Sequence, residues 1–303
     1  MQYMSLVQTK AIIGLVLTSL FWSGNIFVSK FLIGVVPPSL LNLIRWGIAI
    51  LVLLPFVYPQ LRGSFYLVKD SWQSLSFFGF LGVTSYNALL YTAAYTTSGL
   101  NIAVISTVTP ILTVVLAWRF LGEKPGYIEL FGFLFGLLGV LILLSKGSLQ
   151  NLLHLVFSYG DFWMLIACVF WALYTVFLKK MPPKLNPLLF MFFSTAFGFL
   201  LAVPFVVWEL INTEVQIHIN LEVSLALLYV GVFPSIFGYL FFNFGVRVLG
   251  SQMASLNSYL IPVFAAIIGI LFLNEKVEIF HFVSQVAVFF GFCLVIFGSK
   301  KGN

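Results

Sequence analysis

The sequence predicts an all-α integral membrane protein with ten transmembrane helices, arranged as two inverted five-helix repeats. Hydrophobic residues make up 61% of the 303 residues, charged residues only 8%, and the mean hydropathy is +1.09. Soluble domains carry roughly 25% charged residues, so a water-soluble core does not account for this composition. Two further observations support the prediction: ten apolar runs of membrane-spanning length, and landmark residues that recur in the second half.

Ten apolar runs are long enough to cross a bilayer, which takes about 20 helical residues. They lie near 11–33, 39–57, 72–95, 100–120, 126–145, 159–179, 186–209, 223–247, 252–273 and 277–298. Short clusters of proline, glycine and polar residues separate them, such as VVPP, YPQLRGS and LGEKPG. The first run is too long for a signal peptide and lacks a small-residue cleavage site, so we expect it to remain as a span.

Lysine and arginine in the short loops indicate the orientation, because they are enriched on the cytoplasmic side. With the N-terminus inside, eleven of these residues fall on the inner side and three, Lys30, Lys146 and Lys276, on the outer side. We therefore predict that both termini are cytoplasmic. The net charge of +6 has the same explanation, since no basic run with interleaved aromatic residues indicates nucleic-acid binding.

A pattern of landmark residues repeats between the two halves. LTSLFWSGNIFVSKFL in the first run resembles IACVFWALYTVFLKKM in the sixth, and VTPILTVVLAWRFLGEK resembles LIPVFAAIIGILFLNEK. The matched pairs are Trp22 with Trp171, Lys30 with Lys179, Pro110 with Pro262, and Glu123 with Glu275. We therefore divide the chain into repeats at 1–148 and 149–303. Five spans is an odd number, so the second repeat enters the membrane from the opposite face, as in secondary transporters with a site at the repeat interface.

These features resemble the EamA family of the drug/metabolite transporter superfamily. The resemblance is carried by the two five-span halves, by FW in spans 1 and 6, and by a proline followed by GEK or NEK after spans 4 and 9. It implies a carrier in the bacterial cell inner membrane that exports small metabolites, often amino acids. It also implies a central cavity lined by spans 1–4 and 6–9, with spans 5 and 10 as peripheral supports.

Polar and aromatic residues inside the spans identify the candidate substrate cavity, because such side chains in a bilayer face protein or water. Those in spans 1 and 6 lie on one helical face, and those in span 3 map onto span 8 at an offset of 152. The candidates are Trp22, Asn25, Asn87, Tyr91, Trp171, Tyr174, Tyr239 and Asn243. They suit an amphipathic solute held by hydrogen bonds and aromatic faces. The alternatives are hydrogen bonds between helices and, for the tryptophans, packing.

Pro110 and Pro262 lie within the fourth and ninth predicted spans. A proline frees the carbonyl four residues earlier, here those of Ser106 and Ser258. Such carbonyls bind solute or mark a hinge, and a fixed bend is the alternative. We add to the candidate cavity residues both serines and two polar neighbours, Asn257 and Tyr259.

Arg45 is a permanent cation within the second predicted span, roughly 10 Å from the outer face by helical rise. A mid-membrane arginine costs about 2.5 to 3.5 kcal/mol on insertion scales, which disfavours a lipid-facing position. No acidic residue lies three or four positions away. Two interpretations stay open. The side chain reaches the outer interface or caps a helix end, or it faces the cavity and holds a substrate carboxylate by two parallel bonds.

Two smaller motifs concern helix contacts and helix ends. Gly132 and Gly136 form a GxxxG step in span 5, which is typical of close helix packing, and a homodimer through this span is a further hypothesis. Glu123 and Glu275 stand beside lysines at the ends of spans 4 and 9, where we expect solvated side chains.

Motifs of other function classes are missing from the sequence. It contains no G-x-x-x-x-G-K-[ST], G-x-S-x-G or HExxH motif, and its three histidines fall in or beside loops. We expect no catalytic activity, no cofactor and no metal, and as partners a small-molecule substrate and the bilayer. The preferred substrates are amino acids or related zwitterions. The alternatives are cationic drugs, nucleosides or nucleotide-like metabolites and, from another class, a lipid-modifying membrane enzyme. Direction of flux and energy source stay open.

Overall fold

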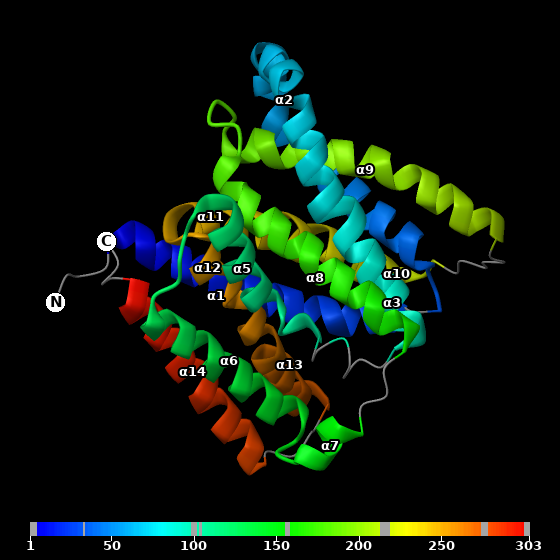
Figure 1. Ribbon diagram of the computed structural model, residues 1–303. Coiled ribbons are helices and arrows are strands. Elements are labelled where there is room, and N and C mark those ends of the chain that lie inside the picture. Colours follow the sequence, from blue (N-terminus) through cyan, green and yellow to red (C-terminus); the bar gives the residue numbers. More distant parts are fainter. Residues whose placement is uncertain are drawn as a thin grey trace.

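The computed structural model describes residues 5–32, 34–97, 102, 105–154, 158–212, 219–273 and 278–299, and every regular element in these ranges is helical (Figure 1). The first half contains α1 Leu6–Leu32, α2 Pro38–Phe78, η1 Gly79–Ser85, α3 Tyr86–Thr96, α5 Thr109–Leu121 and α6 Tyr127–Leu144. The second contains α7 Leu149–Leu153, α8 Tyr159–Phe177, η2 Leu178–Lys180, α9 Pro187–Asn212, α10 Leu221–Val232, η3 Phe233–Phe237, α11 Gly238–Leu249, α12 Ser251–Ser255, α13 Asn257–Leu273 and α14 Ile279–Ser299.

Eight helical segments in the described ranges are long and apolar enough to cross a membrane, and α5 is apolar but shorter. The predicted break YPQLRGS is wrong, because the chain stays helical from Pro38 through Thr96. Pro55 and Pro59 lie inside α2, whose middle stands at the top of Figure 1. The predicted second and third spans thus share one helical stretch, and the count of ten crossings stays a prediction.

Two π-helical turns occupy equivalent places in the two halves. η1 follows α2 and leads into α3, and η3 joins α10 to α11. At the offset of 152 that relates the two proline landmarks, Phe233–Phe237 corresponds to positions 81–85, which lie inside η1. A π-turn widens the helix locally, and it occurs often at functional sites.

Helix α1 runs antiparallel to α11. A Cβ atom added at Gly245 would lie 2.6 Å from the Leu15 side chain, and one at Gly238 would lie 2.8 Å from the Trp22 side chain. Advancing along α1 from Leu15 to Trp22 therefore means moving backward along α11. The small glycine surface lets the two helices approach closely at both points.

Helix α8, in contrast, runs parallel to α11. The Tyr174 hydroxyl donates to Asn243 Oδ1 over 3.0 Å, and a Cβ at Gly250, just after α11, would lie 3.4 Å from Lys179 Nζ. Because α1 opposes α11 and α8 follows it, α1 and α8 run in opposite directions. These are the first long helices of the two repeats, so the geometry agrees with an inverted arrangement.

Helices α6 and α14 form an antiparallel pair at one side of the molecule (Figure 1). A Cβ atom at Gly291 would lie 2.5 Å from the Gly132 carbonyl oxygen, and one at Gly136 would meet the Tyr259 ring at 2.5 Å. The GxxxG step therefore makes close packing contacts within the chain. Since α14 and α13 occupy this glycine face, it presents no free surface to a second copy.

We predict that Gly291→Ala destabilises the fold, because its new methyl group would meet backbone atoms of α6 that cannot give way. Overpacking of this kind costs about 1 to 3 kcal/mol. Gly63→Ala is the matched control: Gly63 is exposed in α2 with nothing within 4 Å, so alanine there should leave stability unchanged or raise it. Thermal unfolding of both variants in detergent measures the difference, and equal melting temperatures would refute the prediction.

Candidate functional site at the repeat interface

Arg45 lies inside the protein, with only 2% of its surface exposed. Its Nε donates to Ser235 Oγ over 2.8 Å, and its Nη1 donates to Asn87 Oδ1 over 3.0 Å and to Tyr91 Oη over 3.1 Å. The guanidinium carbon also lies 5.0 Å from the centre of the Trp46 ring. The side chain therefore points toward two sequence-predicted cavity residues rather than to the outer interface of the membrane.

The positive charge of Arg45 has neutral partners. Across the described ranges, the one ion pair is that of Lys179 with Glu123, and no carboxylate lies within 4 Å of Arg45. A buried charge is costly unless it is paired or hydrogen-bonded, and three neutral oxygens supply part of that stabilisation here. Both Nη1 hydrogens are used, and Nη2 donates to none of the described residues. Two hydrogen-bond donors are therefore available for an anionic group.

Four of the predicted aromatic residues form one cluster beside this cation. Trp22 meets the Trp171 ring edge to face, with 5.1 Å between centroids, and Tyr239 lies 6.0 Å from Trp22 and 5.5 Å from Trp171. Tyr174 stacks on Trp171 at 5.1 Å. The Tyr239 ring also contacts Trp46 at 5.0 Å, which connects the cluster to Arg45. The rings come from α1, α2, α8 and α11, so both repeats contribute.

The cluster also donates hydrogen bonds to one carbonyl group in each π-turn. The Tyr239 hydroxyl donates to the Gly82 carbonyl in η1 over 2.6 Å, and Trp22 Nε1 donates to the Pro234 carbonyl in η3 over 3.0 Å. At the repeat offset Gly82 and Pro234 are equivalent positions. In each repeat, a π-turn carbonyl thus accepts a hydrogen bond from an aromatic side chain of the cluster.

Three other predicted cavity residues are not members of this aromatic cluster. The Tyr259 ring packs on Gly136 between α13 and α6, and its hydroxyl has no partner among the described residues. Asn257 is buried and accepts a hydrogen bond from Ser19 of α1, so it connects two helices. Asn25 is half-buried on α1, and its Oδ1 atom is buried without a partner in the described part of the chain.

The two prolines differ in their local structure. Pro110 lies in the first turn of α5, which begins at Thr109. A turn at residues 107 and 108 separates α5 from the helical residues 105 and 106, so the helical path is interrupted just before this proline, and its role as a kink stays a prediction. Proline is favoured at that position because the first N–H groups of a helix have no intrahelical acceptor. Pro262 lies inside α13 and removes the usual donor for the Ser258 carbonyl. Ser106 and Ser258 are both half-buried.

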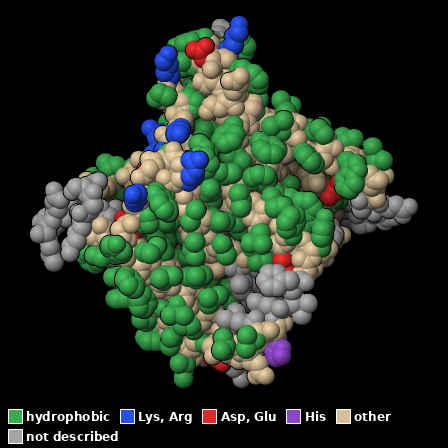
Figure 2. All heavy atoms as spheres, viewed as in Figure 1, with side chains coloured by type: hydrophobic (Ala, Val, Ile, Leu, Met, Phe, Trp, Pro, Cys, Tyr) green, Lys and Arg blue, Asp and Glu red, His purple; other side chains and the backbone are tan. Residues whose placement is uncertain are grey.

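Basic residues gather where α5, α8 and α11 end, at the upper left of Figure 2. Lys179 Nζ pairs with Glu123 Oε1 at 2.5 Å, and Gln252 Nε2 donates to the Glu123 carbonyl over 2.9 Å. Glu123 thus connects three segments from two repeats, while its side chain stays 33% exposed. Its predicted counterpart Glu275 lies outside the described residues. Spacing along the chain gave no signal for the pairing of Lys179 with Glu123, and Ser235 and Trp46 were missed for the same reason.

The fold and site define a class: a multi-pass membrane transporter built from two helical repeats around a polar and aromatic interface. The chain belongs to the EamA-like transporter family, whose profile matches residues 9–145 and 158–297. The uncharacterized transporters YyaM and YetK of Bacillus subtilis (strain 168) are each 27% identical to it. The alignments cover 90% of this chain and 89% of YyaM, and 99% of this chain and 88% of YetK.

Similarity extends beyond bacteria and to a solved structure. An uncharacterized transporter of Archaeoglobus fulgidus is 26% identical over 91% of this chain and 94% of its own length. A crystal structure superposes with a TM-score of 0.79 over 97% of this chain and 98% of that chain, at 17% sequence identity. At that identity the structural match supports the fold alone.

We predict that Tyr239→Phe weakens the contact between the repeats, because the Gly82 carbonyl loses its short hydrogen bond from the Tyr239 hydroxyl and keeps the longer one from Asn87 Nδ2, at 3.5 Å. The loss should be about 1 kcal/mol, as for one hydrogen bond between neutral groups. Tyr127→Phe is the control, since Tyr127 is 86% exposed at the start of α6. Denaturant unfolding in detergent compares the two, and an equal free energy of unfolding would contradict the prediction.

Proposed function

We propose that the protein is a secondary transporter of small carboxylate-bearing metabolites, with amino acids and related zwitterions preferred. The observation that carries the proposal is the buried guanidinium of Arg45, which has two unused donors and no acidic partner among the described residues. A solute carboxylate would supply the missing counter-charge. Charge-assisted bonds of this kind are shorter and stronger than bonds between neutral groups.

The geometry favours an approach of the carboxylate at Nη2. Two parallel bonds would require the solute to replace either the Ser235 contact of Nε or a contact of Nη1. These partners are neutral, so exchanging one for a carboxylate favours the bound state. The aromatic cluster would then receive the apolar part of the solute. Trp22 is the half-buried member of that cluster, and we propose that it moves aside first.

Alternating access follows from the same arrangement. Arg45, Asn87 and Tyr91 belong to the first repeat, whereas Ser235 and most of the aromatic cluster belong to the second. Rocking of one repeat against the other would open this interface to each side in turn. The basic ends of α5, α8 and α11 support a cytoplasmic assignment of that side by the positive-inside rule. We propose export across the bacterial inner membrane, with both termini in the cytoplasm.

A second candidate is a flat solute such as a nucleoside or nucleotide-like metabolite. The edge-to-face and stacked rings of Trp22, Trp171 and Tyr174 favour it, because aromatic faces bind planar rings. Cationic drugs are disfavoured, because the unneutralised Arg45 would repel them. The two candidates differ in their dependence on the guanidinium.

We predict that Arg45→Gln raises the half-saturation concentration for a transported amino acid about tenfold or more. Hydrogen bonds to charged groups contribute about 1.5 to 3 kcal/mol, and tenfold corresponds to about 1.4 kcal/mol. Liposomes containing the purified protein would be tested with labelled amino acids and nucleosides, with and without a pH gradient. Arg247→Gln, at an exposed arginine in the last turn of α11, is the matched control.

The outcomes separate the candidates. Amino-acid transport that is impaired by Arg45→Gln but not by Arg247→Gln supports the proposal. Unchanged amino-acid kinetics in the Arg45 variant removes Arg45 from the site and overturns the carboxylate assignment. Nucleoside transport that is indifferent to Arg45→Gln would favour the second candidate.

A further inference from the structure

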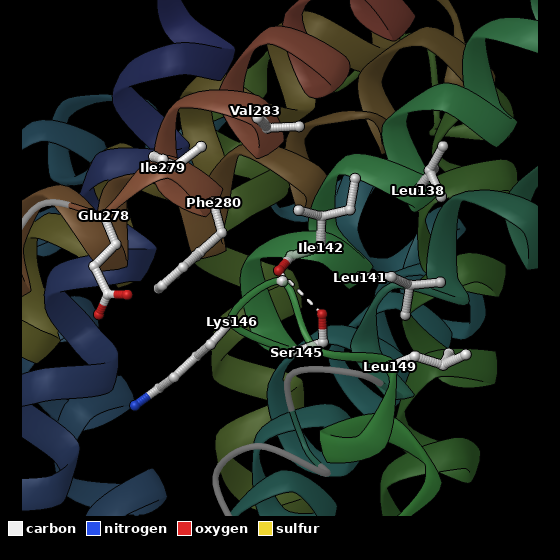
Figure 3. Close-up of a pocket in the computed structure, with 11 residues that line it drawn as sticks. Leu138, Leu141, Ile142, Ser145, Lys146, Leu149, Glu278, Ile279, Phe280 and Val283 are labelled. Carbon is white, nitrogen blue, oxygen red and sulfur yellow. Dashed lines mark hydrogen bonds between the residues drawn. The ribbon is translucent and has the colours of Figure 1, made fainter.

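A groove of about 930 Å³ lies at the end of the molecule where α6 finishes and α14 begins (Figure 3). It is far along the chain from Arg45 and is formed by α6, α14 and the turn before α7. Leu138, Leu141, Ile142, Ile279 and Val283 supply most of its apolar wall. Its size is in the range typical of pockets that take small organic ligands.

The groove faces the surroundings of the helix pair rather than the Arg45 site. Leu138 is 50% exposed, Val283 44% and Ile279 83%, so their apolar surface lies open on the outside of α6 and α14. In a multi-pass membrane protein, apolar surface exposed at the periphery is covered by lipid. The occupant of the groove is therefore expected to bring an acyl chain.

One end of the groove is charged. Lys146 and Glu278 both line it, and Figure 3 shows their side chains extending on the same side of the pocket. They form no ion pair with each other within 4 Å, nor with another residue in the described ranges. A cation and an anion that line the same groove without pairing complement a ligand that carries both charges.

The backbone holds Lys146 in place at a conformational cost. Its φ angle is 52°, in the left-handed region that favours glycine, and the next residue is Gly147 with φ 71°. Gly147 N donates to the Ile142 carbonyl over 3.0 Å and Ser145 Oγ donates to the same carbonyl over 3.1 Å, so the helix end is closed. Glycine at 146 would keep this turn without strain, and the lysine is therefore not required for folding.

We propose that this groove is a binding site for a phospholipid with an ethanolamine headgroup. Lys146 would bind the phosphate, a point-charge contact that lysine commonly makes, and Glu278 would bind the primary ammonium. One acyl chain would lie along Leu138, Ile142 and Val283. The site is separate from solute recognition, so it does not depend on the proposed substrate.

The test uses the purified full chain in mild detergent with equal amounts of dioleoyl phosphatidylethanolamine, phosphatidylcholine and phosphatidylglycerol. Native mass spectrometry counts the lipids retained. We expect phosphatidylethanolamine to be retained most. Lys146→Gly should lower its retention about fivefold, a loss appropriate to an exposed charge contact. Glu278→Gln should abolish the preference over phosphatidylglycerol, because the ammonium loses its partner and the carboxylate no longer repels an anionic headgroup.

The matched control variants each remove one positive or one negative charge at an exposed position outside the groove. Lys69→Gln and Glu222→Gln alter exposed residues on α2 and α10 and should leave lipid retention unchanged. Val283→Trp fills the groove and should lower retention of all three lipids. Thermal unfolding of Lys146→Gly should match the unmodified protein or exceed it, which separates loss of binding from loss of folding.

Three results would overturn the proposal. The first is equal retention of phosphatidylcholine and phosphatidylethanolamine, since the ammonium would then not be recognised. The second is a preference for phosphatidylglycerol in the unmodified protein, which would indicate a site for anionic lipid. The third is retention that neither Lys146→Gly nor Glu278→Gln changes.

Discussion

The buried guanidinium of Arg45 is the constraint on which the interior of this protein depends. It cannot lose its charge, so the surrounding helices must supply oxygen atoms wherever it lies. Asn87 and Tyr91 come from α3 in the first repeat, and Ser235 comes from η3 in the second. The cation thus joins both repeats by hydrogen bonds. An arginine that reached the membrane surface would be solvated by water and headgroups instead, and the interior would not have to supply these oxygen atoms.

The two repeats have similar backbones, but the side chains at equivalent positions make different hydrogen bonds. Asn87 and Tyr91 are equivalent to Tyr239 and Asn243, and both pairs lie next to a π-turn. In the first repeat the pair binds Arg45, whereas in the second it binds Gly82 and Tyr174. The two repeats therefore provide two equivalent pairs of polar residues, and only the pair in the first repeat binds a charged side chain. A solute with a single carboxylate fits this one-sided arrangement.

The helical membrane fold and its two repeats could be predicted from the sequence, because apolar length, loop charge and landmark residues are properties of the chain itself. Sequence reasoning predicted that Trp22, Trp171 and Tyr239 belong to one site, and the structure brings them together. It missed the π-turns, since hydrogen-bond register in a helix leaves no periodic trace in apolar sequence. It also grouped Tyr259 with the cavity, because helical phase alone does not show whether a side chain turns toward α1 or toward α6.

Glycine contacts show which parts of the molecule have least freedom to move. A Cβ at Gly79 of η1 would lie 2.4 Å from a backbone oxygen of α9, and one at Gly291 would lie 2.5 Å from a backbone oxygen of α6. Each contact joins elements from different repeats. The η1–α9 and α6–α14 contacts are thus two seams, at which backbone packing holds the repeats together. Between the seams lie rings and long side chains, which change rotamer without breaking backbone contacts. Motion that admits a solute is therefore expected at the aromatic cluster, with the seams acting as its pivots.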